Sequence, residues 1–185
     1  MAQVRRFDHV GITVGDLDRV ADFFVGLGLE VEGRTFVEGE FLDTVCGIPG
    51  SRTEIVMLKS PGDGGRLELA RFVRPDSEPG APDAMANVLG LRNVCFEVDD
   101  LHGAVGWAAA QGYGLVGGVG EYEGVWRMAY VRGPEGIIVS LAEQIRNAEQ
   151  SRNTEQSRNA EQTEAAEQTE AAEQTEAAEQ TEAAT

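Results

Sequence analysis

Four polar side chains stand at matching positions in two similar halves of the chain. His9 lies in the first predicted strand, and a shift of 84 positions (93 − 9) aligns it with Asn93. Near the end of each half, a second alignment places Glu68 opposite Ser140. An imidazole and a carboxylate can bind a divalent metal ion or transfer a proton, whereas an amide and a hydroxyl mainly form hydrogen bonds. The two halves therefore differ in the chemistry that they offer.

The first half has the pattern of a strand, a helix and three further strands. Apolar and polar residues alternate in Phe7–Val14, which predicts a half-buried strand. Asp16 is placed as an N-cap before apolar residues at helical spacing, and Gly28 ends the helix. A short helical turn is predicted at Phe41–Val45. The remaining strands are predicted at Leu29–Val37, Thr53–Leu58 and Arg66–Phe72.

The second half repeats this order. Asn93–Val98 is predicted as a strand, Asp100 as the cap of a helix, and Gly112 as its end. The last strands are predicted at Leu115–Val119, Trp126–Val131 and Ile137–Leu141. Prolines at positions 75, 79 and 82 indicate an exposed connection. We expect one domain over residues 1–145, made of module one (5–73), a linker (74–88) and module two (89–145).

Residues 146–185 are a different kind of sequence, a run of acidic hexapeptide repeats. They contain ten glutamates and three arginines, a net charge of −7 out of the −17 of the whole chain. A period of six matches no helical repeat, so the alanines do not form one apolar stripe. We expect a disordered tail or a fluctuating helix without a chemical role, although a tail that binds a partner stays an alternative.

The acidic composition argues against several classes of function. A net charge of −17 repels polyphosphates and anionic lipids, so neither nucleic acid nor a membrane is expected as a partner. No apolar run has the length of a membrane helix, and the first residues lack the apolar core of a signal peptide. Cys46 and Cys95 are too few for a disulfide scaffold. We expect a cytoplasmic protein that acts on a small molecule.

The duplicated modules resemble the vicinal oxygen chelate superfamily. The segments that carry the resemblance are DHVGITVGDL at 8–17 and GPEG at 133–136. This superfamily includes glyoxalase I, methylmalonyl-CoA epimerase, extradiol dioxygenases, fosfomycin-resistance enzymes and bleomycin-binding resistance proteins. The resemblance covers about Phe7–Gln144 and implies an α+β fold, in which two tandem βαβββ modules form a curled mixed sheet around a cleft.

The resemblance also implies a metal site, which this sequence matches only in part. In metal-dependent members, a single ion is held by one residue from the first strand and one from the last strand of each module. The corresponding positions in this chain are His9, Glu68, Asn93 and Ser140. Because only His9 and Glu68 are strong donors, a divalent metal is possible but is not expected to bind tightly. The same two residues are the candidate catalytic groups, with Glu68 as a base. Alternatively, His9 is an ordinary cleft histidine and Glu68 is solvated or paired with a neighbouring arginine.

Other residues on the predicted strands are candidates for the lining of the cleft. Asn93 and Ser140 are expected to form hydrogen bonds to a ligand, and Tyr122 to belong to a lid. Aromatic and thioether side chains with a few polar groups suit an organic molecule of modest size. In the alternative interpretation, half of these side chains belong to the ordinary core and do not line a cleft. The strands that border the cleft carry Glu54, Cys95, Glu97, Trp126, Arg127 and Met128.

Three functions compete on these grounds. The first is a protein of the glyoxalase and bleomycin-resistance type that binds a small organic molecule, such as a toxic or antibiotic compound, beside a degenerate metal site. The second is an epimerase, isomerase or lyase that acts on a carbonyl compound or acyl-CoA through His9 and Glu68, with or without a metal ion. The third is a scaffold with a partner-binding tail. The resemblance further implies a homodimer, and the linker length favours a cleft within each chain.

Overall fold

The first half of the chain forms one mixed sheet with a helix on one face. The structure is a computed structural model that describes residues 3–62 and 64–145, so the predicted tail at 146–185 lies outside the described residues. β1 is the parallel neighbour of β4 at one edge, and the sheet order is β1-β4-β3-β2. The elements are β1 (His9–Thr13), α1 (Leu17–Gly26), β2 (Glu30–Glu38), α2 (Glu40–Cys46), β3 (Arg52–Lys59) and β4 (Arg66–Arg74).

The second half forms a matching sheet in the order β5-β9-β8-β6, with β7 also paired to β8. β5 is parallel to β9, as β1 is to β4. The elements are β5 (Asn93–Glu97), α3 (Leu101–Ala110), β6 (Gly114–Leu115), β7 (Gly120–Tyr122), β8 (Trp126–Arg132), the short helix η1 (Pro134–Gly136) and β9 (Ile138–Gln144). The α+β fold with two mixed sheets is therefore confirmed.

One predicted strand in the second half is wrong. Instead of a strand at Leu115–Val119, the chain forms the short β6, leaves the sheet, and returns as β7. Gly117 and Gly118 lie in this interruption, where the absence of side chains weakens strand formation. Tyr122, which was expected in a lid, is part of β7 and lies opposite Trp126 of β8.

Both long helices begin at the predicted caps. The Asp16 carboxylate accepts a hydrogen bond from the backbone N–H of Arg19 at 3.1 Å, and Asp100 accepts one from Gly103 at 2.9 Å. Each bond satisfies a backbone donor that the helix itself leaves unpaired. The duplicated sequence thus produces duplicated helix starts, which fix where β1 and β5 end.

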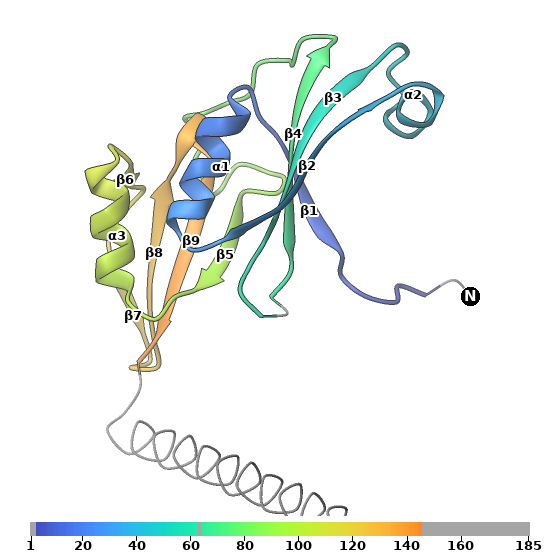
Figure 1. Cartoon of the computed structure of the whole chain (residues 1–185). Coiled ribbons are helices and arrows are strands. Elements are labelled where there is room, and N and C mark those ends of the chain that lie inside the picture. Colours follow the sequence, from blue (N-terminus) through green and yellow to red (C-terminus); the bar gives the residue numbers. More distant parts are fainter. Residues whose placement is uncertain (1–2, 63, 146–185) are drawn as a thin grey trace, which may run out of the picture. The chain divides into compact units, whose positions relative to one another are not determined.

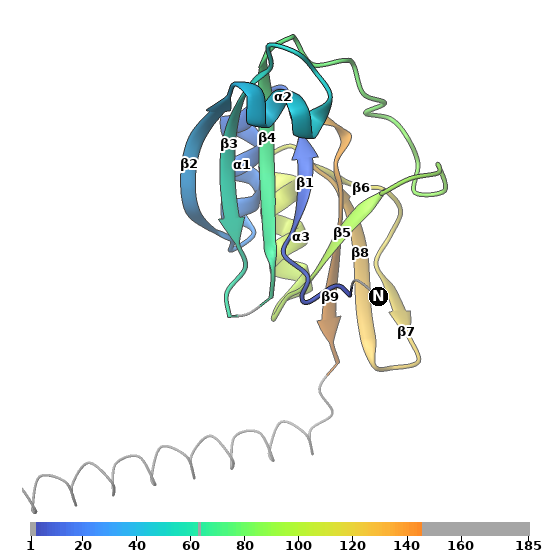
Figure 2. The same ribbon diagram turned by 90° about the vertical axis from the view of Figure 1, so that its right-hand side faces the viewer.

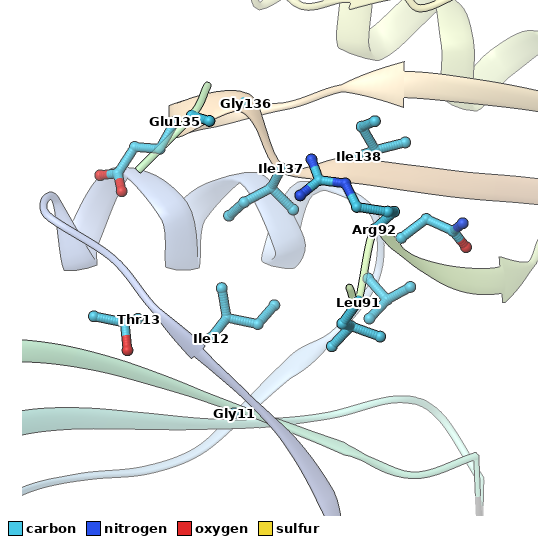
Figure 3. A pocket seen from close by; sticks show the side chains of 12 residues that line it. Gly11, Ile12, Thr13, Leu91, Arg92, Glu135, Gly136, Ile137 and Ile138 are labelled. Carbon is cyan, nitrogen blue, oxygen red and sulfur yellow. The ribbon is translucent and has the colours of Figure 1, made fainter. Parts of the chain in front are cut away.

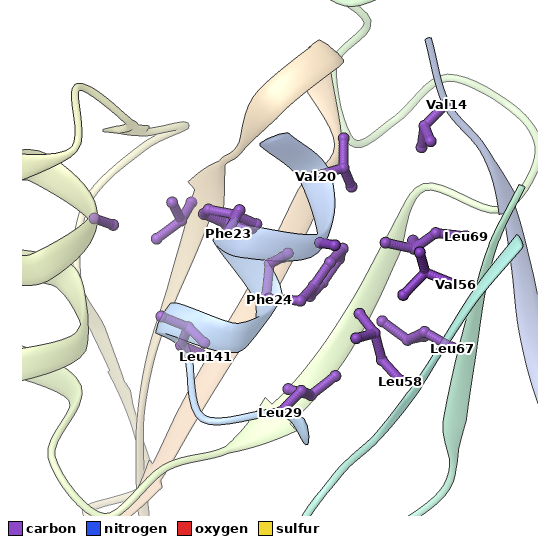
Figure 4. Packing of buried hydrophobic residues seen from close by; sticks show 14 of the residues in the cluster. Val14, Val20, Phe23, Phe24, Leu29, Val56, Leu58, Leu67, Leu69 and Leu141 are labelled. Carbon is purple, nitrogen blue, oxygen red and sulfur yellow. The ribbon is translucent and has the colours of Figure 1, made fainter. Parts of the chain in front are cut away.

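The two sheets share one hydrophobic core on their helix side. In Figures 1 and 2, α1 and α3 lie on the same side of the strands. Phe24 of α1 is fully buried among Val56, Leu58 and Leu69 of the first sheet (Figure 4). Its ring also meets Phe96 of β5 edge to face. Burial of apolar surface stabilises the fold by about 25 cal/mol per Å². The core therefore holds both modules together and leaves the opposite face of each sheet for other contacts.

The segment from 75 to 92 connects the modules and contains no helix or strand in the described residues. Arg132 of β8 binds it, because its guanidinium donates hydrogen bonds to the backbone oxygens of Pro82 at 2.7 Å and Ala84 at 3.1 Å. The connection is thus tied to the second sheet. In the part of the chain that the structure describes, no helix has both the length and the apolar character needed to cross a membrane.

Candidate functional site

The residues predicted as catalytic, metal-binding or ligand-binding project from the face of their sheet that is turned away from the helices, here called the helix-free face of that sheet. Side chains alternate along a strand, so the residues between core positions point to this face. Val10, Ile12, Leu67 and Leu69 belong to the core of the first sheet, as Val94, Phe96, Val139 and Leu141 do in the second. The residues placed on the helix-free face are His9, Glu68, Asn93, Cys95, Glu97, Trp126, Met128 and Ser140.

His9 and Glu68 come together at the edge of the first sheet. The His9 Nε2 atom lies 4.0 Å from Glu68 Oε2, and the two side chains are 36% and 28% exposed. On its other side, His9 Nδ1 is 3.0 Å from Asp8 Oδ2. Because a carboxylate only accepts, Nδ1 must be the donor, and in the neutral imidazole Nε2 is then an acceptor directed toward Glu68. The pair therefore offers two acceptors to an O–H or N–H group placed between them.

Asp8 was not among the predicted site residues, although it precedes His9 directly. Arg6 donates a hydrogen bond to its carboxylate at 2.8 Å. The hydrogen bond from His9, with a smaller contribution from Arg6, lowers the pKa of Asp8 below its ordinary value. Asp8 thus stays ionised and fixes which imidazole nitrogen faces Glu68. The sequence signal that was available was the Asp-His pair itself, a carboxylate beside the only histidine on a predicted strand.

Glu68 does not use the arginines that flank it in sequence. Arg66 is held 2.8 Å from Glu32, and Arg71 lies 2.8 Å from Glu54. The structure therefore does not pair Glu68 with either of these arginines. His9 is its ionisable neighbour among the described residues.

The second sheet contributes neutral polar groups. Asn93 is half-buried at the start of β5, and Cys95 lies opposite Ser140 of β9. Ser140 is only 2% exposed, and its Oγ has no hydrogen-bond partner within the part of the chain that the structure describes. Burying a hydroxyl without a hydrogen-bond partner costs about 1–3 kcal/mol of folding free energy. A hydrogen bond to Ser140 Oγ would recover part of this cost.

The four aligned residues do not fit a tightly held metal ion. Imidazole and carboxylate are strong donors, but an amide oxygen and a neutral hydroxyl are weak ones. Within the described residues, no group of three or more histidine, cysteine, aspartate or glutamate side chains is placed to hold an ion. The roles of His9 and Glu68 as metal ligands or catalytic groups therefore stay predictions.

Two residues on the bordering strands were expected near the cleft but lie on the helix side. Glu54 has the same orientation as Val56 and is paired with Arg71. Arg127 has the same orientation as Ala129, and its guanidinium lies 2.9 Å from Glu121. Both side chains are ion-paired. The prediction was wrong because it assigned whole strands to the cleft, whereas successive side chains of a strand point to opposite faces of the sheet.

Two pockets lie where β1 and β5, the edge strands of the two sheets, approach each other. One has a volume of about 350 Å³ and is lined by β1 residues 11–13 and by Asn93. The other has about 250 Å³ and reaches from Phe7 to Cys95. Arg92 extends into the larger one (Figure 3) and was missed by the sequence reasoning. A signal existed, because the shift of 84 that aligns His9 with Asn93 also aligns Asp8 with Arg92, a reversal of charge.

Comparison with known proteins gives related structures. Residues 8–130 match the model of the glyoxalase, bleomycin resistance protein and dioxygenase superfamily. A crystal structure of a glyoxalase family protein from Bacillus cereus is 39% identical, with a TM-score of 0.75 over 78% of this chain and 97% of that one.

More distant structures share the fold alone. A glyoxalase, bleomycin resistance protein and dioxygenase domain from Frankia is 18% identical, with a TM-score of 0.54 over 80% of this chain and 95% of that one. A glyoxalase I variant from Zea mays is 16% identical, with a TM-score of 0.53 over 76% of this chain and 48% of that one. No protein with a curated function matches the chain.

Proposed function

The chain belongs to the glyoxalase, bleomycin resistance protein and dioxygenase superfamily, and from this premise we propose that it binds a small organic molecule on the helix-free face without a tightly held metal ion. The observation that carries the proposal is the proximity of His9 and Glu68, whose Nε2 and Oε2 atoms are 4.0 Å apart with no arginine of the described residues paired to either side chain. Two partly exposed acceptors held together in this way are arranged for a ligand donor.

The helix-free face of the second sheet carries further groups that suit an organic ligand. Among the described residues the Ser140 hydroxyl has no hydrogen-bond partner, and the Asn93 amide can both donate and accept. Trp126 and Met128 add half-buried apolar surface on this face of the second sheet. For the first sheet, the expected ligand is a compact organic molecule that has an O–H or N–H group for His9 and Glu68.

Ligand binding is tested with the two histidines of the chain as a matched pair. The purified full chain is analysed by native mass spectrometry for a retained molecule and by thermal shift with small aromatic phenols and amidines. A compound that stabilises the protein should lose roughly tenfold or more in affinity in His9→Gln, because a hydrogen bond to a charged or polar pair is removed. The exposed His102→Gln should bind as the wild type does. Equal affinity in both variants would contradict the proposal.

A second candidate function is proton transfer at a carbon atom. The Asp8–His9–Glu68 arrangement favours it, since a carboxylate that orients an imidazole beside a second carboxylate is suited to general acid–base catalysis. In this case Glu68 would remove a proton from an acyl-CoA or carbonyl substrate, and the imidazolium form of His9 would donate a hydrogen bond from Nε2 to the substrate oxygen.

Deuterium exchange distinguishes the two candidates. Thioesters, branched acids and hemithioacetals are incubated with the protein in deuterated water, and the label at the substrate carbon is followed by mass spectrometry. Exchange that Glu68→Gln abolishes and His102→Gln retains would establish the enzymatic function. Binding without exchange would leave the protein as a binder. The homodimer and the cytoplasmic location stay predictions.

A further inference from the structure

The larger pocket between the edge strands has a cation at one side and branched apolar side chains around it. Ile12 belongs to β1, Leu91 precedes β5, and Ile137 and Ile138 belong to the turn and strand at the start of β9. In Figure 3 the Arg92 side chain reaches across the space toward Ile137 and Ile138. Asn93 lines this pocket, but neither His9 nor Glu68 does, so the inference does not rest on the His9–Glu68 pair that carries the proposed function.

Arg92 has no anionic partner in the described part of the chain. Its Nε is buried without any hydrogen-bond partner, and no ion pair or side-chain hydrogen bond to it is found among the described residues. The Nε of Arg71 is unpaired as well, but the Arg71 guanidinium lies 2.8 Å from Glu54, so Arg92 differs in lacking an ion pair among the described residues. A partly buried cation without a counter-ion is unfavourable. In a protein with a net charge of −17, which has more than twice as many acidic as basic residues, an arginine without a carboxylate partner is unexpected.

The one carboxylate that lines the pocket is already occupied. Glu135 accepts hydrogen bonds from the backbone N–H groups of Gly15, at 3.0 and 2.8 Å, and of Asp16, at 2.7 Å. These bonds hold it at the N-terminal end of α1, where a negative charge is favoured. The Glu135 carboxylate is therefore bound to the start of α1 and does not compensate the charge of Arg92.

We propose that this pocket binds a small organic carboxylate, with the carboxylate on the Arg92 guanidinium and a branched apolar portion against Ile12, Leu91, Ile137 and Ile138. The planar guanidinium matches a carboxylate with two parallel hydrogen bonds. The volume of about 350 Å³ is at the small end of the range for ligand pockets, which favours a compact acid over a nucleotide or a lipid. Thr13 and Asn93, which also line the pocket, can bond to further oxygen atoms of the ligand.

The probe is isovalerate, a branched carboxylate, with isovaleramide as its neutral isostere and inorganic phosphate as an anion without an apolar portion. Binding to the full-length protein is followed by calorimetry and by changes in the backbone amide signals of residues 11–13 and 136–138. The variants are Arg92→Gln and, as a control that removes the same charge from an exposed position, Arg5→Gln.

Isovalerate is expected to bind the wild type and Arg5→Gln alike, with signal changes confined to the pocket. Isovaleramide and phosphate should bind less tightly, and Arg92→Gln should weaken isovalerate binding by about tenfold or more, since a charged hydrogen bond is lost. Because Arg92 has no ion-pair partner among the described residues, Arg92→Gln should melt at or above the wild-type temperature. Unchanged affinity in Arg92→Gln, equal binding of isovaleramide or phosphate, or no saturable binding of isovalerate would each overturn the proposal. A lower melting temperature would show that Arg92 is structural and would also overturn it.

Discussion

Glu135 connects the end of module two to the start of module one, and its substitution tests how strongly the modules depend on each other. Its carboxylate accepts hydrogen bonds from Gly15 and Asp16, which are about 120 residues away in the chain. Glu135 also has a positive φ of 55°, which is uncommon for a residue with a side chain. The backbone of the turn is therefore bent in a way that brings this carboxylate to α1.

The change Glu135→Gln keeps the shape of the side chain but removes the charge and one acceptor oxygen. Hydrogen bonds to a charged group contribute about 1.5–3 kcal/mol, and a charge at a helix terminus about 0.3–1 kcal/mol. Since Glu135 is exposed and glutamine retains one acceptor, the expected loss is about 1–2 kcal/mol in the free energy of unfolding. The melting temperature should fall by roughly 3 to 8 °C.

The loss is measured by urea unfolding and by calorimetry at neutral pH. Glu123→Gln is the matched control, because Glu123 is also an exposed glutamate with a positive φ, of 52°, and no hydrogen bond to its carboxylate is found in the described residues. It should change the free energy of unfolding by less than about 0.5 kcal/mol. If the two variants lose the same stability, the contact between the modules is not the source of the effect and the reasoning is refuted.

Two further predictions concern single contacts. Hydrogen bonds from the backbone N–H groups of Gly50 and Ser51 lower the pKa of Asp43. The ionised carboxylate therefore stabilises the fold at any pH above the unfolded pKa of about 3.9. This contribution disappears as the pH falls through the lower pKa of the folded state. Wild type should therefore exceed Asp43→Asn in melting temperature at pH 7 and converge with it in acid; a constant difference would contradict this. Gly136→Ala should lower the free energy of unfolding by about 2–3 kcal/mol, because a Cβ would lie 2.1 Å from the Pro82 oxygen at a φ of +80°. Unchanged urea unfolding would show that the loop at Pro82 moves aside.

Local and periodic features of the fold could be predicted from the sequence. The alternation around Val10 and the helix caps at Asp16 and Asp100 depend on neighbours within a few residues, and the structure confirms them. The duplicated register also predicted that His9 and Asn93 would occupy equivalent strand positions. Such features follow from spacing alone, because strand and helix geometry fix the direction of each side chain.

Contacts between distant segments could not be predicted in the same way. The Glu135 carboxylate reaches Gly15 only because the two modules pack on one core, which no local pattern indicates. Arg92 is recognised as a candidate only from its place in the pocket between β1 and β5 and from the lack of an ion pair to it among the described residues. The residue types at His9 and Glu68 suggested chemistry, but their distance of 4.0 Å required the parallel pairing of β1 with β4.

The most direct test of the proposed function is a calorimetric titration of the metal-free full chain with Zn²⁺, Ni²⁺, Co²⁺ and Mn²⁺. The weak donors at Asn93 and Ser140 predict no stoichiometric binding in the submicromolar range. One ion bound per chain with submicromolar affinity, and lost in both His9→Gln and Glu68→Gln, would contradict the account, because the helix-free face would then be a metal centre.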